Sequence, residues 1–169
     1  KQSSLTNAPE TFVTLPPKKP SAARANLIEA MEHPSAWVDS VYNTLTLDER
    51  IAQLIIIEAF SDQGPAYEAD VLRLVQKYKV GGIIFFQGGP VRQAKLTNLY
   101  QSVSEVPLLI TMDAETGIGM RLDSTVQYPF QMMLGAVEDN GLIYRMGAEI
   151  AHEFKRLGMH INFAPVADI

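Results

Sequence analysis

The sequence has no cysteine among its 169 residues, and this absence excludes disulfides, thiolate metal sites and cysteine nucleophiles. It also has no apolar run that approaches the roughly 18 residues needed to cross a bilayer, so we expect no membrane span. Residues 1–20 lack the apolar core of about 7 to 15 residues that a signal peptide carries. Either the chain is cytoplasmic or a signal has been removed.

Basic residues are also few. Lys and Arg number 14 against 19 Asp and Glu, which gives a net charge of −5. Proteins that bind nucleic acids usually carry a basic patch or stripe, so we expect no nucleic-acid partner.

The three histidines, His33, His152 and His160, are scattered without metal-ligand spacing, and we expect no metal and no cofactor. We expect His33 to lie in a linker, His152 on a helix surface and His160 in a structural place, with an acid–base role for His160 left open.

The first residues are rich in Ser, Thr, Pro and Lys and show no sustained apolar period. We expect residues 1–35 to form an extended leader or linker and residues 36–169 to form one domain. Mature exported proteins often begin in this way, so we expect an exported protein, which is periplasmic, attached to an outer membrane or extracellular.

Apolar periodicity then alternates between strand and helix. A capping box of Thr46 and Glu49 begins the first helix, and Gly81 with Gly82 marks the end of the second. Strands are expected at 54–60, 81–87, 108–112 and 160–169, and helical stripes at 47–55, 71–78, 96–103 and 143–157.

Strands and helices that alternate at this spacing indicate βα units and a parallel sheet, so the fold class is α/β. About 135 residues follow the leader, which is enough for four units, whereas a complete (β/α)8 barrel takes about 250. Two interpretations stay open, which are a small open sheet and the first half of a larger fold.

The most informative segment is Leu108–Arg121, LLITMDAETGIGMR, where an apolar strand leads into two carboxylates, two glycines and an arginine. Ligands gather at the carboxyl ends of strands in α/β folds, so Asp113, Glu115 and Arg121 are candidates for a polar site. Asp113 and Glu115 are two residues apart and would share a face of a strand, as an acid and nucleophile pair could. One of them could instead pair with Arg121 to hold the loop.

Two further features have competing interpretations. Gly117 and Gly119 after a strand suggest a dinucleotide site, but LDSTVQYPF does not look like the helix that such a site needs.

Arg92 could reach the site or lie in a solvated first turn after Pro90. The methionines, among them Met132 and Met133, are expected to fill gaps in the core.

Taken together, LTLDERIAQL, VGGIIFF, LLITMDAETGIGMR, YPFQMMLGA and GMHINFAPVADI resemble the amino-terminal domain of glycoside hydrolase family 3, especially its β-N-acetylhexosaminidase branch. The resemblance covers about residues 36–169 and implies a (β/α)8 TIM-type barrel, of which this chain holds about the first half. The family motif looks like D-x-E-G-G-x-V-x-R. In this chain Thr116 stands where the family usually has glycine, and Gly119 where it usually has valine.

The resemblance implies that Asp113 accepts hydrogen bonds from sugar hydroxyls and that Arg121 supports the same subsite. Glu115, Gly117 and Asp168 would support the site, and Asp168 would not be the nucleophile. In the family the lysine–histidine pair, the acid/base and the aspartate nucleophile lie beyond the segment that matches PVADI. The resemblance therefore implies no catalytic residue within this chain.

The leading hypothesis is the amino-terminal part of an exo-acting, retaining β-glycosidase, a β-N-acetylhexosaminidase that acts on glycan or cell-wall sugars, with this stretch inactive by itself. The alternatives are a β-glucosidase of the same family, a noncatalytic sugar-binding α/β module and a nucleotide-binding domain. The sequence predicts neither the sugar nor the oligomeric state.

Overall fold

The computed structural model describes residue 33 and residues 35–165. Its helices are α2 (Ala36–Thr44), α3 (Leu47–Ala52), α4 (Pro65–Tyr78), α5 (Pro90–Val103), η1 (Ile118–Met120, a 3-10 helix), α6 (Gln131–Leu134) and α7 (Asn140–Arg156). Its strands are β1 (Ile56–Ala59), β2 (Gly82–Phe85), β3 (Leu109–Met112) and β4 (Ile161–Asn162).

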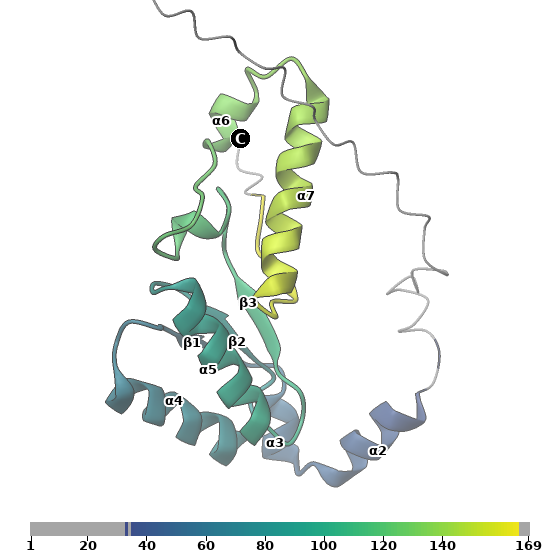
Figure 1. Cartoon of the computed structure of the whole chain (residues 1–169). Coiled ribbons are helices and arrows are strands. Elements are labelled where there is room, and N and C mark those ends of the chain that lie inside the picture. The colour runs from purple at the N-terminus through teal and green to yellow at the C-terminus, as the bar shows by residue number, and fades with distance from the viewer. Residues whose placement is uncertain (1–32, 34, 166–169) are drawn as a thin grey trace, which may run out of the picture.

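The four strands form one parallel sheet in the order β1-β2-β3-β4. Each strand lies beside the next one along the chain, and α4, α5 and α7 form the connections between them. In Figure 1, α4 and α5 lie side by side near β1 and β2, and α7 lies farther along the sheet beside β4. The α/β class and the βα units predicted from periodicity are confirmed.

The core lies between the sheet and these helices. Its fully buried members come mostly from alternate strand positions and from the inner faces of α4 and α5, because side chains alternate across a strand and recur every three to four residues on a helix. They include Val75, Ile83, Phe85, Tyr100, Leu108, Ile110 and Met112.

The helix before the first strand begins with the predicted capping box. The Thr46 hydroxyl accepts from the Glu49 backbone N–H, and a Glu49 carboxylate oxygen accepts from the Thr46 N–H at 2.8 Å. These contacts satisfy two donors at the helix start that have no partner within the helix. The predicted start of α3 is therefore confirmed.

The helix before β2 ends earlier than its glycines suggest. Tyr78 is its last residue, and Lys79 takes the left-handed conformation at φ 54°. Gly81 serves a different purpose, because a Cβ there would lie 1.9 Å from the backbone oxygen of Gln53. The glycine lets the chain pass close to the end of α3, where its N–H donates to the Ala52 oxygen.

The sequence predicts the fourth strand over 160–169, of which the structure describes residues 160–165. Within that described part Ile161 and Asn162 form β4 and pair with β3, and a cis peptide bond joins Ala164 to Pro165. The expected leader lies outside the described residues, except for His33 and Ser35, and so do residues 166–169. Ser35 caps α2, which the periodicity did not reveal.

The prediction that the methionines fill the core is wrong for Met132 and Met133. Their side chains are 92% and 61% exposed on the four-residue helix α6, whereas Met112 is fully buried on β3. A short helix that follows a loop presents most of its side chains to solvent, because too few turns pack against the sheet.

Candidate sugar-binding site

The candidate site lies at the carboxyl edge of the sheet, where β1, β2 and β3 end together. Phe60 follows β1, Phe86 follows β2 and Asp113 follows β3. Because the strands are parallel and Ala59 pairs with Phe85, the next residues of β1 and β2 come side by side. The rings of Phe60 and Phe86 stack with centroids 5.6 Å apart.

Asp113 and Arg121 form the polar centre of this edge. The Arg121 Nε donates to Asp113 Oδ1 at 2.7 Å and the Arg121 Nη2 donates to Asp113 Oδ2 at 2.6 Å. Both side chains are largely buried, with 17% of Arg121 and 28% of Asp113 exposed. Two parallel charge-assisted hydrogen bonds fix both the position and the plane of the carboxylate. The structure thus brings together two of the predicted site residues.

The Arg121 guanidinium is also held by an aromatic ring. Its Cζ lies 5.0 Å from the centroid of the Phe86 ring, within the range of a cation–π contact. The β2 end therefore contacts the same arginine that holds the carboxylate after β3.

The loop from Asp113 to Arg121 turns sharply so that its two ends meet. The Gly117 N–H donates to the Ala114 backbone oxygen. Gly117 takes a φ of 82°, a backbone conformation that residues other than glycine rarely adopt. The helix η1 then places Arg121 one short turn later. The backbone conformation of Gly117 thus shapes the turn that returns the chain toward Asp113.

One of the two departures from the family motif, Gly119, has a local packing reason. A Cβ at Gly119 would lie 2.5 Å from the backbone of Val126, whose oxygen accepts from the Gly119 N–H. Thr116 is 1% exposed, and its backbone oxygen accepts from the Tyr128 N–H. The segment after η1 therefore packs directly on this loop and leaves no room for a side chain at position 119.

The same segment excludes the dinucleotide interpretation. A phosphate-binding helix would begin at the glycines, whereas the chain forms only the 3-10 helix η1 and then turns. The next α-helix in the described residues is the four-residue α6, which begins at Gln131.

Arg92 reaches out of the first turn of α5 but does not bond to Asp113. Its Nη2 donates to Asp123 Oδ2 at 2.6 Å, and its Nε donates to the Ser61 oxygen at 2.9 Å. The Arg92 guanidinium lowers the pKa of the Asp123 carboxyl. Arg92 therefore links the loops that follow β1 and β3, at the rim of the site.

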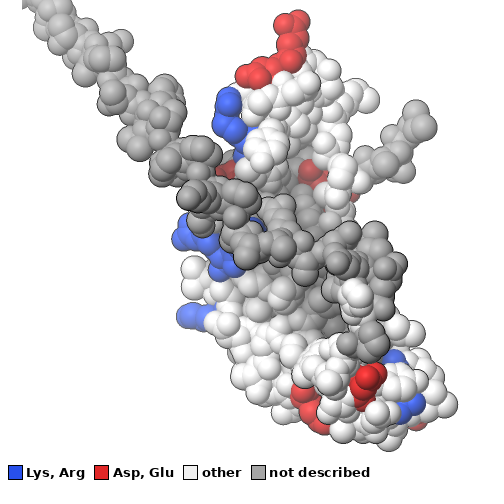
Figure 2. Space-filling model, turned by 90° about the vertical axis from the view of Figure 1, so that its right-hand side faces the viewer, with Lys and Arg blue, Asp and Glu red and all other residues white. Residues whose placement is uncertain are grey.

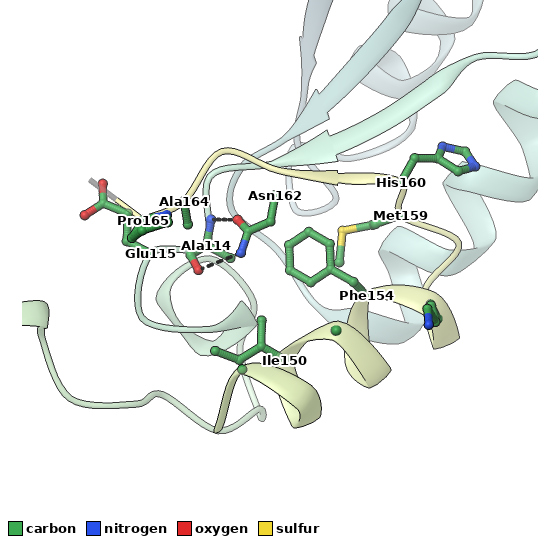
Figure 3. Close-up of a pocket in the computed structure, with 12 residues that line it drawn as sticks. Ala114, Glu115, Ile150, Phe154, Met159, His160, Asn162, Ala164 and Pro165 are labelled. Atoms are coloured by element: carbon green, nitrogen blue, oxygen red, sulfur yellow. Dashed lines mark hydrogen bonds between the residues drawn. The ribbon is translucent and has the colours of Figure 1, made fainter. Parts of the chain in front are cut away.

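Glu115 lies beside a cavity that Asp113 does not line. It lines a cavity of about 380 Å³ between the end of β3, β4 and α7, together with Ile150, Phe154 and Asn162 (Figure 3). The Glu115 backbone oxygen accepts from the Gln131 side chain at 2.8 Å, so the residue braces the loop through its main chain. Because β3 ends at Met112, Asp113 and Glu115 lie beyond the strand and do not share a strand face, contrary to the expectation.

Asn162 fastens the end of β3 to β4. Its Oδ1 accepts from the Ala114 N–H at 2.9 Å, and its Nδ2 donates to the Ala114 oxygen, as the dashed lines in Figure 3 show. Ala114 is fully buried between Asp113 and Glu115. These two bonds hold the backbone of Ala114, the residue between Asp113 and Glu115.

The histidines lie apart from the polar centre. The His160 Nδ1 accepts from the Ile110 N–H at 2.9 Å. This side-chain hydrogen bond continues the pairing of β3 with β4, so the expected structural role of His160 is confirmed. His152 is exposed on α7, as predicted, and lies 3.8 Å from Glu149. The described residues contain no group of three or more metal-ligating side chains. Asp168 lies outside the described residues.

The charged side chains on the surface of the described residues do not indicate a binding site for a charged partner. On the face drawn in Figure 2, the visible Lys and Arg side chains stand in small separate groups among uncharged surface. None of the helices in the described part of the chain is long and apolar enough to cross a bilayer.

Sequence reasoning missed Phe60, Phe86 and Asn162. A usable signal was present for the two phenylalanines, because each directly follows the last residue of an apolar strand run, IIIEA and GGIIF. Asn162 gave no such signal, since its partner lies 48 positions earlier in the sequence.

Comparison with known proteins connects this geometry to a family. The family model described as "Glycosyl hydrolase family 3 N terminal domain" matches residues 46–169. A "Beta-N-acetylglucosaminidase/beta-glucosidase" of Cellulomonas fimi is 27% identical over 134 residues, which are 79% of this chain and 23% of that protein. A "Probable beta-glucosidase L" of Aspergillus terreus is 33% identical over 69% of this chain and 16% of its own length.

A solved structure shares the fold. The "Beta-glucoside phosphorylase BglX bound to 2FGlc" superposes with a TM-score of 0.64 at 23% identity, over 79% of this chain and 24% of that chain. The chain thus spans less than a quarter of the length of these proteins.

Proposed function

Because this chain belongs to the family of the glycosyl hydrolase family 3 N-terminal domain, we propose that it supplies the amino-terminal part of the barrel in a β-glycosidase. The four-stranded parallel sheet is consistent with a partial TIM-type barrel. The substrate would be a glycan or a cell-wall saccharide, cleaved from its nonreducing end with retention of configuration. The activity would belong to the whole protein that contains these residues.

The observation that carries the proposal is the Asp113–Arg121 pair at the carboxyl edge of the sheet. Active sites of TIM barrels lie at this edge. A carboxylate that is held bidentately by arginine keeps further lone pairs on both oxygens. It can therefore accept hydrogen bonds from two neighbouring sugar hydroxyls.

Such a carboxylate would also select the sugar. A hydroxyl of the wrong epimer would leave a carboxylate oxygen without its partner, and a buried unpaired acceptor costs about 1–3 kcal/mol. Asp113 and Arg121 would thus bind and orient the sugar. Bond cleavage would need a nucleophile and an acid/base, and none of the described residues is assigned to these roles.

The favoured substrate is an N-acetyl-β-hexosaminide, and a β-glucoside is the second candidate. The name of the Cellulomonas fimi relative contains both activities, which supports testing the two sugars in parallel. Export of the protein stays a prediction from composition.

The test compares Asp113→Ala with the wild type in the protein expressed from its whole open reading frame. Loss of hydrogen bonds that strengthen in the transition state should lower kcat/KM about 100-fold or more on an aryl N-acetyl-β-glucosaminide or an aryl β-glucoside. Asp70→Ala is the matched control, because Asp70 lies on α4 in an exposed ion pair with Arg73.

Unchanged kinetics in Asp113→Ala would overturn the site assignment. A wild-type protein that binds either sugar but cleaves neither would favour a noncatalytic sugar-binding module instead. Equal losses in Asp113→Ala and Asp70→Ala would indicate a general defect in folding.

A further inference from the structure

We infer that Phe86 is a positioning residue for the sugar site: its ring orients the Arg121 guanidinium, which in turn orients the Asp113 carboxylate. The inference rests on the proposed function of Asp113. It concerns the residue directly after β2, which lies outside the motif of the β3 loop.

The ring of Phe86 contacts the guanidinium of Arg121. The guanidinium carbon lies 5.0 Å from the ring centroid, and the side chain of Arg121 is only 17% exposed. Arginine has several rotatable bonds, and holding it in one rotamer costs free energy that an aromatic face can offset. The ring thus limits the planes that the guanidinium can adopt.

Phe86 itself is anchored by its neighbours. Its N–H donates to the Ala59 oxygen at 2.9 Å, so its backbone is tied to β1. Its ring stacks on Phe60 at 5.6 Å, and Phe60 packs edge-on against Tyr67 of α4 at 5.9 Å. The Tyr67 hydroxyl donates to the Glu58 backbone oxygen at 3.4 Å. The series Tyr67, Phe60, Phe86 therefore connects a helix and two strand ends to the arginine.

The position of the guanidinium also affects the carboxylate. Both oxygens of Asp113 receive a hydrogen bond from Arg121, so a tilt of the guanidinium turns the carboxylate with it. Misplacing a group that binds substrate by about 1 Å can cost about 100-fold in rate. Removal of the aromatic face should therefore weaken sugar binding while the charge of Asp113 and Arg121 remains.

The experiment measures kcat and KM of Phe86→Leu in the whole protein. Loss of a partly buried cation–π contact should lower kcat/KM about 5- to 30-fold, with a rise in KM. Phe86→Tyr keeps the aromatic face and should stay within about 3-fold of the wild type. Phe86→Met, which is also flexible and apolar, is measured in parallel in case the leucine variant does not fold. Phe130→Leu, an exposed phenylalanine before α6, is the matched control.

A structural role of Phe86 gives a different pattern. A folding defect would reduce the amount of active protein and so lower the apparent kcat with KM unchanged, and that result would overturn the inference. The same holds if Phe86→Tyr loses as much activity as Phe86→Leu.

A double-mutant cycle separates the two roles further. If Phe86 acts through Arg121, then Phe86→Leu should change kcat/KM by less than about 2-fold in an Arg121→Met background. An equal loss in both backgrounds would overturn the inference. Failure of the proposed function is distinct, because it would appear as an unaffected Asp113→Ala variant, whatever the Phe86 variants do.

Discussion

Glycines in the β3 loop allow Arg121 to return to Asp113. Gly117 supplies a positive φ, and Gly119 makes room for the backbone of Val126. The need for glycine at position 119 is steric, because the backbone of Gly119 does not take a left-handed conformation. Position 119 therefore tolerates no side chain while the segment from Ser124 to Tyr128 packs where it does.

We predict that Gly119→Ala destabilises the fold by about 1–3 kcal/mol, since the new Cβ would force the loop apart. A Cβ at Gly147, in the middle of α7, meets nothing within 4 Å. Gly147→Ala is the matched control and should instead stabilise the protein by up to about 1 kcal/mol. Thermal or urea denaturation measures the stability of both variants relative to the wild type. A Gly119→Ala variant as stable as the wild type would contradict the packing account.

The motif around Asp113 predicts the two charged site residues but not the third partner. Asp113 and Arg121 lie eight positions apart on one loop, so the local sequence is enough to expect their contact. Phe86 reaches Arg121 only because β2 and β3 pair in a particular register, with Ile84 opposite Thr111. Contacts that depend on register between distant segments cannot be deduced from local patterns.

Among the elements, α3 has the clearest electrostatic contribution. A hydrogen bond from Lys79, followed by hydrogen bonds from the backbone and hydroxyl of Thr46, lowers the pKa of Glu49 from 4.5 to about 2. Lys79 also pairs with Glu105, and contact with both carboxylates raises its pKa. These contacts join the start of α3 to the end of α4.

We predict that acid weakens this junction. A carboxyl whose pKa is lower in the folded state stabilises the fold above its ordinary pKa and loses that contribution as protonation proceeds. The contribution of Glu49 should be complete above pH 4.5 and fall between pH 4.5 and about 2. Melting temperatures across this range should therefore drop less steeply in Glu49→Gln than in the wild type. Parallel curves for the two proteins would contradict the assignment.

Periodicity predicts the helices better than it predicts the strands. The stripe from Ile143 to Leu157 identifies α7, and Gly158 ends it with a φ of 72° as expected. The apolar run at 160–169 predicts a long strand, yet within its described part, 160–165, two residues pair with β3. Strand length depends on the neighbour that is available for pairing, which a single segment does not encode.

At the scale of the whole molecule, the sheet is parallel and open. Among the described residues, β1 and β4 each pair with a strand on one side only. Parallel sheets are normally covered on both faces, yet Ile55, Ile56 and Leu109 are 48%, 37% and 47% exposed. These exposed side chains fit a partial barrel, in which further βα units would cover them.

The proposed sugar site lies at the carboxyl edge of this sheet, where Asp113 would bind the sugar hydroxyls. The most direct measurement is a crystal structure of the protein from its whole open reading frame with N-acetylglucosamine bound. We predict sugar hydroxyl oxygens within about 2.5–3.0 Å of the Asp113 carboxylate oxygens, with the Arg121 pair intact. A sugar bound elsewhere, with no contact to Asp113, would contradict the account.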